Sequence, residues 1–420
     1  MALQVITLSS IGTGTRVELG VTNDVFVSVG VTLGAQFATS ILGFGSNHTA
    51  TIAGSVITGA SPEAAVKLGD VPDSDSGERL VVVAGGLLVG GYGAVINATA
   101  SYIENHGTIT GQVVGVYLAA IGTGTSQIVN TGTISGLDAV QTAGTDTKIL
   151  TNYGFISGTI ASFNSFEAGV DIVINRGTMV GDVKLGAGDD RYDGRGGSIE
   201  GTVFGEDGND RFIPGAVAEI FDGGTGLDTL DFRYGGAVTV TLDGTDAGTG
   251  AALGDTYLNC EVIYGSLSGA DTLTGSDLAD RLLGLGGNDR LAGGDGADLL
   301  IGGGGGDSIA GGTGSDAFQF NRAVEGGDLI SDFSNVIGNN DGFRISAVGF
   351  GAGLVAGMLP AAQFIQRVDN LAQDANDHFI FRTTDATLWF DANGNAAGGL
   401  TLLADLQAGA TVTAADILIF

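Results

Sequence analysis

Aspartates recur at nine-residue intervals in the segment 266–319, and each lies in a glycine-rich block two places before an apolar residue. The six acids are Asp271, Asp280, Asp289, Asp298, Asp307 and Asp316. Glycines let a tight turn adopt backbone angles that other residues resist, and they leave the carbonyl oxygens of the turn exposed. Calcium takes about six to eight oxygen ligands in a flexible geometry, which carboxylates and carbonyls can supply together. The spacing therefore predicts a series of calcium-binding turns.

Two blocks should complete one coil of eighteen residues, in which the last three residues of each block form a short strand with its apolar side chain inward. Alternate acids then line opposite sides of the coil, with ions between successive turns. The other turn positions expected around the ions are Gly284, Gly286, Gly293, Gly294, Gly296, Gly302, Gly303, Gly305, Gly311, Gly312, Gly314, Asn288 and Asp295. The first two blocks lack most of these glycines, so Asp271 and Asp280 are weaker candidates. The alternative is that acidic turns only keep the chain soluble.

A sparser version of the pattern lies upstream of the six blocks. The segments LGAGDDRYD, GEDGNDRFI and GGTGLDTLD place Asp190, Asp210 and Asp228 at intervals of 20 and 18 residues, which is one acid per coil. We interpret these acids as calcium turns along one edge of a solenoid. Plain acidic turns without a metal are the alternative.

The N-terminal half carries a longer repeat of 22–25 residues, visible in IENHGTITG, IVNTGTISG, LTNYGFISG and VINRGTMVG within 103–181. A period of this length is one rung of a parallel β-helix, in which alternate side chains point inward. Aliphatic residues align at two places and should stack in the core. An asparagine aligns at a third place, in Asn105, Asn130, Asn152 and Asn175. We interpret this row as a structural asparagine ladder, with a ligand-binding stripe as the alternative.

Composition excludes several classes of function. The chain has 420 residues with 47 acidic and 16 basic side chains, and its net charge of -31 excludes nucleic acid as a partner, because backbone binding needs clustered Lys and Arg. No run of about 18 or more apolar residues occurs, so no transmembrane segment is expected. Cys260 is the only cysteine, which rules out an internal disulfide framework. The N-terminus lacks the basic head and apolar core of a conventional signal peptide.

The blocks at 266–319 resemble those of the repeats-in-toxin (RTX) calcium-binding proteins. The segment 231–266 is similar to the strand-rich spacer that often precedes such repeats, and 321–345, 377–399 and 412–420 are similar to the C-terminal region of proteins exported by type I secretion. The resemblance covers about 190–420. It implies calcium as the cofactor, passage through the type I secretion machinery, and a location outside a Gram-negative cell or on its surface. It also implies a roll that stays largely unfolded until calcium is plentiful.

No catalytic constellation stands out in the sequence, and we expect no enzyme. His48, His106 and His378 are isolated, so the His-Glu-x-x-His pattern of zinc proteases is absent, and we expect all three on the surface or in turns. The Gly-x-Ser-x-Gly elbow of lipases is absent too. The main rival is a polysaccharide-binding or polysaccharide-modifying (lyase- or epimerase-like) β-helix. The side chains available to such a face are Arg79, Lys148, Arg176, Lys184, Tyr102, Tyr117 and Tyr153.

These patterns together predict an all-β protein in four parts. A parallel β-helix is expected over 1–230, a strand-rich spacer over 231–264, an RTX calcium β-roll over 265–320, and a C-terminal cap with the secretion signal over 321–420. We expect a secreted, non-enzymatic calcium-binding protein with a structural or adhesive role at the cell surface or in the matrix. Besides calcium ions, the expected partners are further copies of the chain, as an oligomer, filament or surface lattice, and an extracellular polysaccharide.

Overall fold

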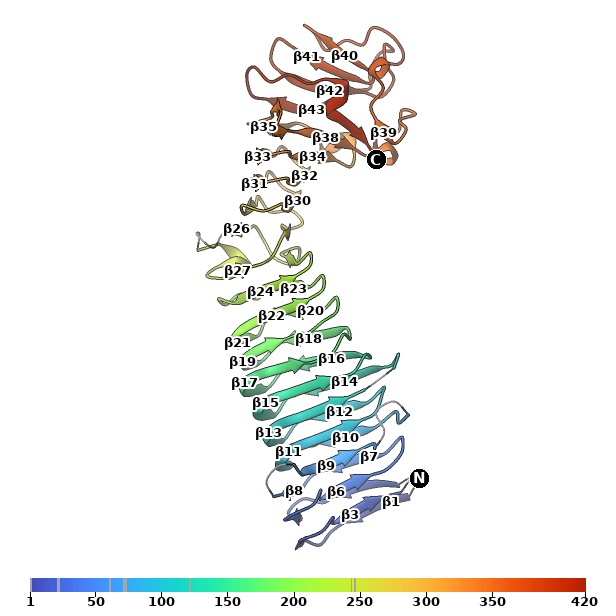
Figure 1. The fold of residues 1–420 in the computed structure, drawn as a ribbon, viewed down its shortest axis with the longest axis vertical. Coiled ribbons are helices and arrows are strands. Elements are labelled where there is room, and N and C mark those ends of the chain that lie inside the picture. The colour runs from blue at the N-terminus through green and yellow to red at the C-terminus, as the bar shows by residue number, and fades with distance from the viewer. Residues whose placement is uncertain are drawn as a thin grey trace. The chain divides into compact units, whose positions relative to one another are not determined.

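Strands make up nearly all the regular structure of the chain (Figure 1). The computed structural model describes residues 2–20, 23–59, 62–70, 74–120, 122–242, 244 and 247–420. The chain divides into two compact units, Met1–Asp228 and Thr229–Phe420, called unit 1 and unit 2 below. The predicted all-β fold of a parallel β-helix followed by a β-roll is confirmed. The finer division of unit 2 into spacer, roll and cap stays a prediction.

Unit 1 contains a first sheet to which each coil contributes one strand, and every neighbouring pair is parallel. In spatial order these strands are β1 (Ala2–Ile6), β4 (Asn23–Val27), β7 (Thr49–Ile52), β10 (Arg79–Val82), β12 (Tyr102–Asn105), β14 (Thr125–Asn130), β16 (Thr147–Asn152), β18 (Asp171–Asn175), β20 (Arg191–Asp193) and β23 (Arg211–Ile213).

The second sheet of unit 1 forms the rest of each coil. In the first three coils it is split into two short strands, namely β2 (Ser10–Gly12) with β3 (Val17–Leu19), β5 (Thr32–Ala35) with β6 (Ile41–Gly43), and β8 (Ser55–Thr58) with β9 (Ala64–Leu68). In later coils the two pieces merge into long strands interrupted by register shifts. These and the remaining strands are β11 (Leu87–Asn97), β13 (Thr108–Ala119), β15 (Thr133–Ala143), β17 (Phe155–Ser165), β19 (Thr178–Lys184), β21 (Ser198–Glu200), β22 (Thr202–Asp207) and β24 (Ile220–Thr225).

Equivalent residues of successive coils stack on one another inside unit 1. The first aliphatic row is in register and buried at Ile103, Ile128, Leu150 and Val173, and the second at Ile109, Ile134, Ile156 and Met179. The asparagines form the predicted ladder, in which each amide Nδ2 donates to the Oδ1 of the next at 2.7–2.9 Å. The asparagine row is thus buried structure, because its amides bond to one another and to turn backbone atoms.

Unit 2 contains two facing sets of parallel strands. One set is β25 (Thr229–Asp231), β28 (Val262–Tyr264), β30 (Arg281–Gly286), β32 (Leu299–Gly304), β34 (Ala317–Phe320), β38 (Gly342–Ile345) and β44 (Ile417–Ile419), with β39 (Gly357–Met358) antiparallel to β44. The other set is β26 (Thr239–Thr241), β29 (Thr272–Thr274), β31 (Arg290–Gly296), β33 (Ser308–Gly314), β35 (Asp328–Ile330) and β43 (Leu400–Leu406), followed by β42 (Thr387–Asp391), β41 (Phe379–Arg382) and β40 (Phe364–Arg367). The remaining elements are β27 (Thr256–Leu258), the hairpin β36 (Asn335–Val336) and β37 (Asn339–Asn340), η1 (Gly250–Ala252), η2 (Ala323–Glu325), α1 (Ala347–Phe350), η3 (Ala361–Gln363) and η4 (Ala414–Asp416).

Five of the six strands within 265–320 are longer than the three residues that the sequence predicts, and only β29 has that length. Strands β31 and β33 each have 7 residues, because their pairing continues through the glycines as far as Gly296 and Gly314. Segments near the C-terminus continue both sets of strands, since β43 pairs with β35 and β44 pairs with β38. The core between the sets stacks like on like, with Leu291 beside Ile309 in one set.

Two of the three histidines lie in the interior rather than at the surface, which makes that prediction wrong for them. His48 is fully buried, and its Nδ1 lies 3.0 Å from the Glu78 carboxylate. His378 is buried beside the backbone oxygen of Asp391 at 2.9 Å. Each buried histidine has a polar partner elsewhere in the sequence, which offsets the cost of burying the ring. Local sequence patterns therefore did not reveal that these histidines are buried. Among the described residues, no helix is both long and apolar enough to cross a membrane.

Candidate metal centre

The acids of the nonapeptide blocks form two ladders of hydrogen bonds in unit 2. In the first ladder the backbone N–H of each aspartate donates to Oδ1 of the aspartate one coil later, at 2.8–2.9 Å, through Asp271, Asp289, Asp307 and Asp328. The second ladder runs in the same way at 2.8–3.1 Å through Asp280, Asp298, Asp316 and Asp341. Alternate acids therefore line opposite sides of the coil, as their spacing predicted.

Two ladder members, Asp328 and Asp341, are absent from the sequence-based prediction. They follow the preceding acids of their ladders by 21 and 25 residues, which breaks the nine-residue period. A weaker signal exists, because each lies two places before a buried core residue, Ile330 or Phe343, as in the regular blocks. Loops of unequal length obscure in the sequence that these two acids occupy the same position as the regular ones. The strand register shows that they do.

The second carboxylate oxygen separates two kinds of turn. In Asp289, Asp298, Asp307 and Asp316 the Oδ2 atom is buried and has no hydrogen-bond partner. In Asp271 and Asp280 the same atom accepts the backbone N–H of a serine at 2.6 Å and its hydroxyl at 3.0 Å, from Ser266 and Ser276 respectively. Burying a carboxylate oxygen without a partner is costly. Four turns thus need a cation or a proton at the Oδ2 atom. In the turns of Asp271 and Asp280, serine donors bind this atom instead.

Each unpartnered oxygen lies beside a glycine whose missing side chain leaves a small space, called a cradle below. A methyl group at Gly293 would overlap both Oδ2 of Asp298 and the carbonyl oxygen of Gly311, one coil later. The same overlap with the aspartate Oδ2 would occur at Gly284, Gly302 and Gly311. At Gly284 and Gly293 a carboxylate oxygen and a backbone carbonyl oxygen thus lie beside the same space, which is a donor set suited to calcium.

The other predicted turn residues have different roles. The glycines with a left-handed backbone, in which other residues would be strained, are Gly294, Gly296, Gly303, Gly305, Gly312 and Gly314. Asn288 and Asp295 are exposed, and their side chains join neighbouring turns by accepting from the Gly306 N–H and the Thr313 hydroxyl. A methyl at Gly286 would meet the backbone oxygen of Leu267 at 2.9 Å, so this glycine allows close approach of two turns.

Burial raises the pKa of the ladder acids, with neighbouring carboxylates adding to the effect. The pKa of Asp289 rises to about 6, that of Asp298 to about 7 and that of Asp328 to about 8. The pKa of Asp307 and that of Asp316 are also raised, chiefly by burial. A cation beside these oxygens would have the opposite effect, since it favours the charged form. Without one, the ladders tend to hold protons near neutral pH.

The second ladder ends in backbone hydrogen bonds. Asp341 uses both oxygens, accepting from the N–H groups of Asp316 and Ser334 at 3.1 and 2.7 Å. Asp332 accepts from the N–H groups of Gly311 and Gly312, both at 2.9 Å. The segment after the repeats thus covers polar backbone groups that the last regular turn would otherwise leave exposed.

A third ladder lies in unit 1 and contains the upstream acids. The backbone N–H groups of Asp190 and Asp210 donate to Oδ1 of Asp210 and Asp228 at 2.8 and 2.7 Å. The ladder begins one coil earlier, at Asp171, whose N–H donates to Asp190 at 2.7 Å. Sequence reasoning missed Asp171, because no glycine-rich block surrounds it. A methyl at Gly205 would overlap Asp210 Oδ2 and the Gly223 carbonyl oxygen, as Gly293 does in unit 2.

No three His, Cys, Asp or Glu side chains within the described ranges converge on one metal position. Each ladder instead offers one carboxylate per turn. A calcium ion there would take its other ligands from the carbonyl oxygens of the turns and from water.

Comparison with known proteins places the repeats in a family. Residues 266–300 and 283–318 match the family model of the RTX calcium-binding nonapeptide repeat (4 copies). Among solved structures, one match is the solution structure of the AlgE6R3 subunit of the mannuronan C5-epimerase from Azotobacter vinelandii, with 29% identity, a TM-score of 0.24, and coverage of 36% of this chain and 81% of that chain. No curated protein matches the sequence.

Filling one cradle should remove one ion and leave the fold otherwise intact. Gly293→Ala places a methyl against Asp298 Oδ2, so we expect calorimetric titration to count about one calcium fewer per chain. At calcium about 100 times its dissociation constant, the loss of one ion costs about 2.7 kcal/mol of stability. The matched control is Gly304→Ala, whose methyl would meet only Leu285 O at 3.9 Å. Equal ion counts in both variants would contradict the cradle assignment.

Without calcium, unit 2 should become less stable as pH rises. The folded pKa values of Asp289, Asp298 and Asp328 lie near 6, 7 and 8, above the ordinary aspartate value of 3.8. The folded state therefore holds more protons than the unfolded state, and its stabilisation is full below about pH 4 and is lost as pH rises through 6 to 8. Urea unfolding followed by Trp389, the single tryptophan, should show a falling midpoint from pH 5 to pH 8 in chelator. Asp298→Asn should flatten this slope; a flat wild-type profile would refute the prediction.

Proposed function

Because residues 266–318 carry RTX calcium-binding nonapeptide repeats, we propose that calcium folds unit 2 and that the protein acts outside the cell as a structural or adhesive component. The observation that supports this most directly is the set of buried, unpartnered carboxylate oxygens in four successive turns. These belong to Asp289, Asp298, Asp307 and Asp316.

The repeats act as a calcium switch because folding stacks their carboxylates, and these negative charges repel one another. The glycine-rich coils lose about 1–2 kcal/mol of backbone entropy per residue on ordering. Stacked carboxylates oppose the same step. A bound calcium ion supplies the positive charge between turns. Four ions at about 100 times their dissociation constant would add about 11 kcal/mol, which is comparable with the whole stability of a typical domain.

An extracellular location is supported by how the chain is stabilised. Calcium is plentiful outside cells, and the RTX resemblance implies export by type I secretion from a Gram-negative bacterium. Cys260 is buried and is the only cysteine, so no internal disulfide stabilises the chain. Bound ions would then serve the purpose that disulfides serve in many secreted proteins.

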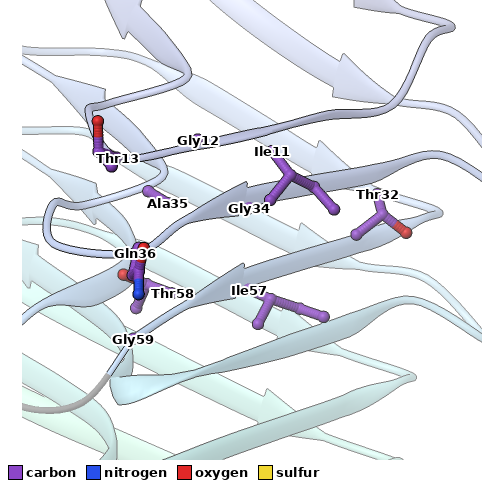
Figure 2. A pocket seen from close by; sticks show the side chains of 10 residues that line it. All are labelled: Ile11, Gly12, Thr13, Thr32, Gly34, Ala35, Gln36, Ile57, Thr58 and Gly59. Carbon is purple, nitrogen blue, oxygen red and sulfur yellow. The ribbon is translucent and has the colours of Figure 1, made fainter.

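Self-association is supported by the first coil of unit 1. Strands β1 and β2 each pair on one side only within the described residues, with β4 and β5. This coil exposes four large apolar side chains, which are Leu3, Val5, Leu8 and Ile11. A hollow of about 380 Å³ lies over β2, β5 and β8. Figure 2 shows the side chains of Ile11 and Ile57, which line it. Copies of a chain with a net charge of -31 repel one another, so calcium should be needed for assembly.

Glycan binding is the second candidate function, supported by a groove on unit 1. The groove, of about 350 Å³, is lined by Thr39, Pro62, Glu63, Ala64, Lys67, Tyr92, Val95, Asn97 and Tyr117. The rings of Tyr92 and Tyr117 lie 6.2 Å apart at 72°, beside polar groups that could bond sugar hydroxyls. Lys148, one of the cations first considered for such a face, is buried instead, and Arg176 pairs with Asp193.

A calcium titration of the full chain tests the main proposal. We expect the β-signal in circular dichroism, Trp389 fluorescence and the scattered light to rise together as calcium is added after chelation. A rise in β-signal with a monomeric particle would support calcium-driven folding and contradict assembly. No spectral change up to about 10 mM calcium, about ten times the dissociation constant of the weakest extracellular calcium modules, would overturn the proposal.

A polysaccharide screen tests the second candidate. The double variant Tyr92→Ala and Tyr117→Ala should weaken binding of a retained glycan by about tenfold or more, since two stacking rings are lost. Tyr153→Ala is the control, because this tyrosine is exposed outside the groove. Modified or shortened glycan in the product would instead identify an enzyme, and no retained glycan would remove this candidate.

A further inference from the structure

One corner of unit 1 carries a column of side chains that changes from hydroxyl to ammonium to carboxylate. Ser126 is in register with Lys148 on the next coil, and Lys148 is in register with Asp171 on the coil after that. The aspartate ladder then continues the column through Asp190 and Asp210. Parallel coils stack equivalent positions at about 4.8 Å, so each of these groups occupies the same place in its coil.

Lys148 is the cation of this column, and its hydrogen-bond and ion-pair partners are oxygen atoms. Its ammonium donates to the backbone oxygens of Gly144 at 2.6 Å and Asp146 at 3.1 Å, and it lies 2.9 Å from Asp146 Oδ1. The side chain is 2% exposed. Two turn carbonyls and one carboxylate around a buried positive charge match the ligand types that calcium takes. At this coil the cage therefore holds a cation that is part of the chain.

The next coils keep the oxygen atoms and lack the lysine. Asp171 is fully buried and neither of its carboxylate oxygens makes a well-formed hydrogen bond, although the Ser165 hydroxyl and the Lys148 ammonium lie near enough to lower its pKa. Oδ2 of Asp190 and of Asp210 are buried without a partner too. An isolated buried charge of this kind is expensive unless a counter-charge reaches it. Burial accordingly raises the pKa of Asp171 to about 7 and that of Asp190 to about 8.

Turn carbonyl oxygens lie near two of these acids. A methyl at Gly188 would stand 2.6 Å from the Gly169 carbonyl oxygen and 3.3 Å from Asp190 Oδ1, the oxygen that accepts the Asp171 N–H. At Gly205 it would overlap the unpartnered Asp210 Oδ2 and the Gly223 carbonyl oxygen. This glycine precedes its acid by five places, as Gly293 precedes Asp298 in the repeats of unit 2. The site at Gly205 thus has the same ligand types in the same arrangement, outside the residues that match the repeat family.

We propose that unit 1 binds calcium of its own along the corner formed by Asp171, Asp190 and Asp210, and that Lys148 is the built-in cation that ends this column. The proposal goes beyond calcium-driven folding of unit 2, because it assigns metal sites to the β-helix itself. It also gives Lys148 a role: at this coil an ammonium makes the structure independent of calcium, and the following coils depend on the ion.

Hydrogen exchange of the full chain separates the two units. In wild-type protein, calcium should slow amide exchange in β18, β20 and β22 by about tenfold or more, the factor expected for an ion at ten times its dissociation constant. The double variant Asp190→Asn and Asp210→Asn should lose this slowing and bind fewer ions by calorimetry, while β30–β33 keep theirs. The double variant Asp289→Asn and Asp307→Asn should behave in the opposite way. If the proposed calcium-driven folding of unit 2 is wrong, calcium will not slow amide exchange in β30–β33, whatever its effect on unit 1.

Two further variants keep the test sharp if the asparagine variant folds poorly. Gly205→Ala fills the cradle beside Asp210 and leaves the acids in place, and it should reduce the ion count where Gly20→Ala, with nothing within 4 Å of its methyl, does not. Lys148→Ala should make β14, β16 and β18 dependent on calcium, with much faster exchange in chelator than in calcium. An ion count unchanged in Gly205→Ala, or a Lys148→Ala defect that calcium does not relieve, would overturn the proposal.

Discussion

Every aspartate ladder in this protein depends on a carboxylate that serves two coils at once. One oxygen accepts a backbone N–H from the preceding coil and thereby ties two coils together, as Asp289 does for Asp271. The other oxygen faces the turn. Because parallel coils place like residues beside like, this arrangement also stacks negative charges a few ångströms apart. At an effective dielectric constant near 20, two such charges repel by about 3–4 kcal/mol. The hydrogen bonds that hold the coils together therefore also bring together negative charges that repel one another.

The structure deals with this conflict in different ways at equivalent places. At Asp271 and Asp280 a serine hydroxyl and N–H satisfy the second oxygen, although Oδ1 of Asp280 is buried without a partner. At the corner of unit 1, Lys148 brings its own positive charge to an oxygen cage. In the remaining turns a glycine leaves space beside a buried carboxylate oxygen that has no hydrogen-bond partner among the described residues. Calcium dependence on this view belongs to individual turns and does not require the whole solenoid.

The segment after the repeats gives the roll an end. Its strands β43 and β44 continue both sets of strands, so the last repeat strands are not left as open edges. Phe333 and Phe343 stack with ring centroids 5.0 Å apart next to Phe318 and replace aliphatic rows by aromatic packing. Asp332 and Asp341 cap backbone groups of the final turns. These paired strands offer an edge on which calcium-loaded coils can stack.

The period of the acids alone was enough to predict the coil of eighteen residues, the two rows and the donor type, because side-chain direction in a stacked coil follows directly from spacing. The asparagine ladder of unit 1 followed from its period in the same way. Tertiary structure alone decided which acids have an unpartnered oxygen, because the sequence does not show that Ser266 and Ser276 fold back onto the acids of their own blocks. It also decided that Asp171, Asp328 and Asp341 join ladders, and that Lys148 and His48 are buried with acidic partners. Loops of unequal length separate these residues in the sequence, and only strand register and packing bring them together.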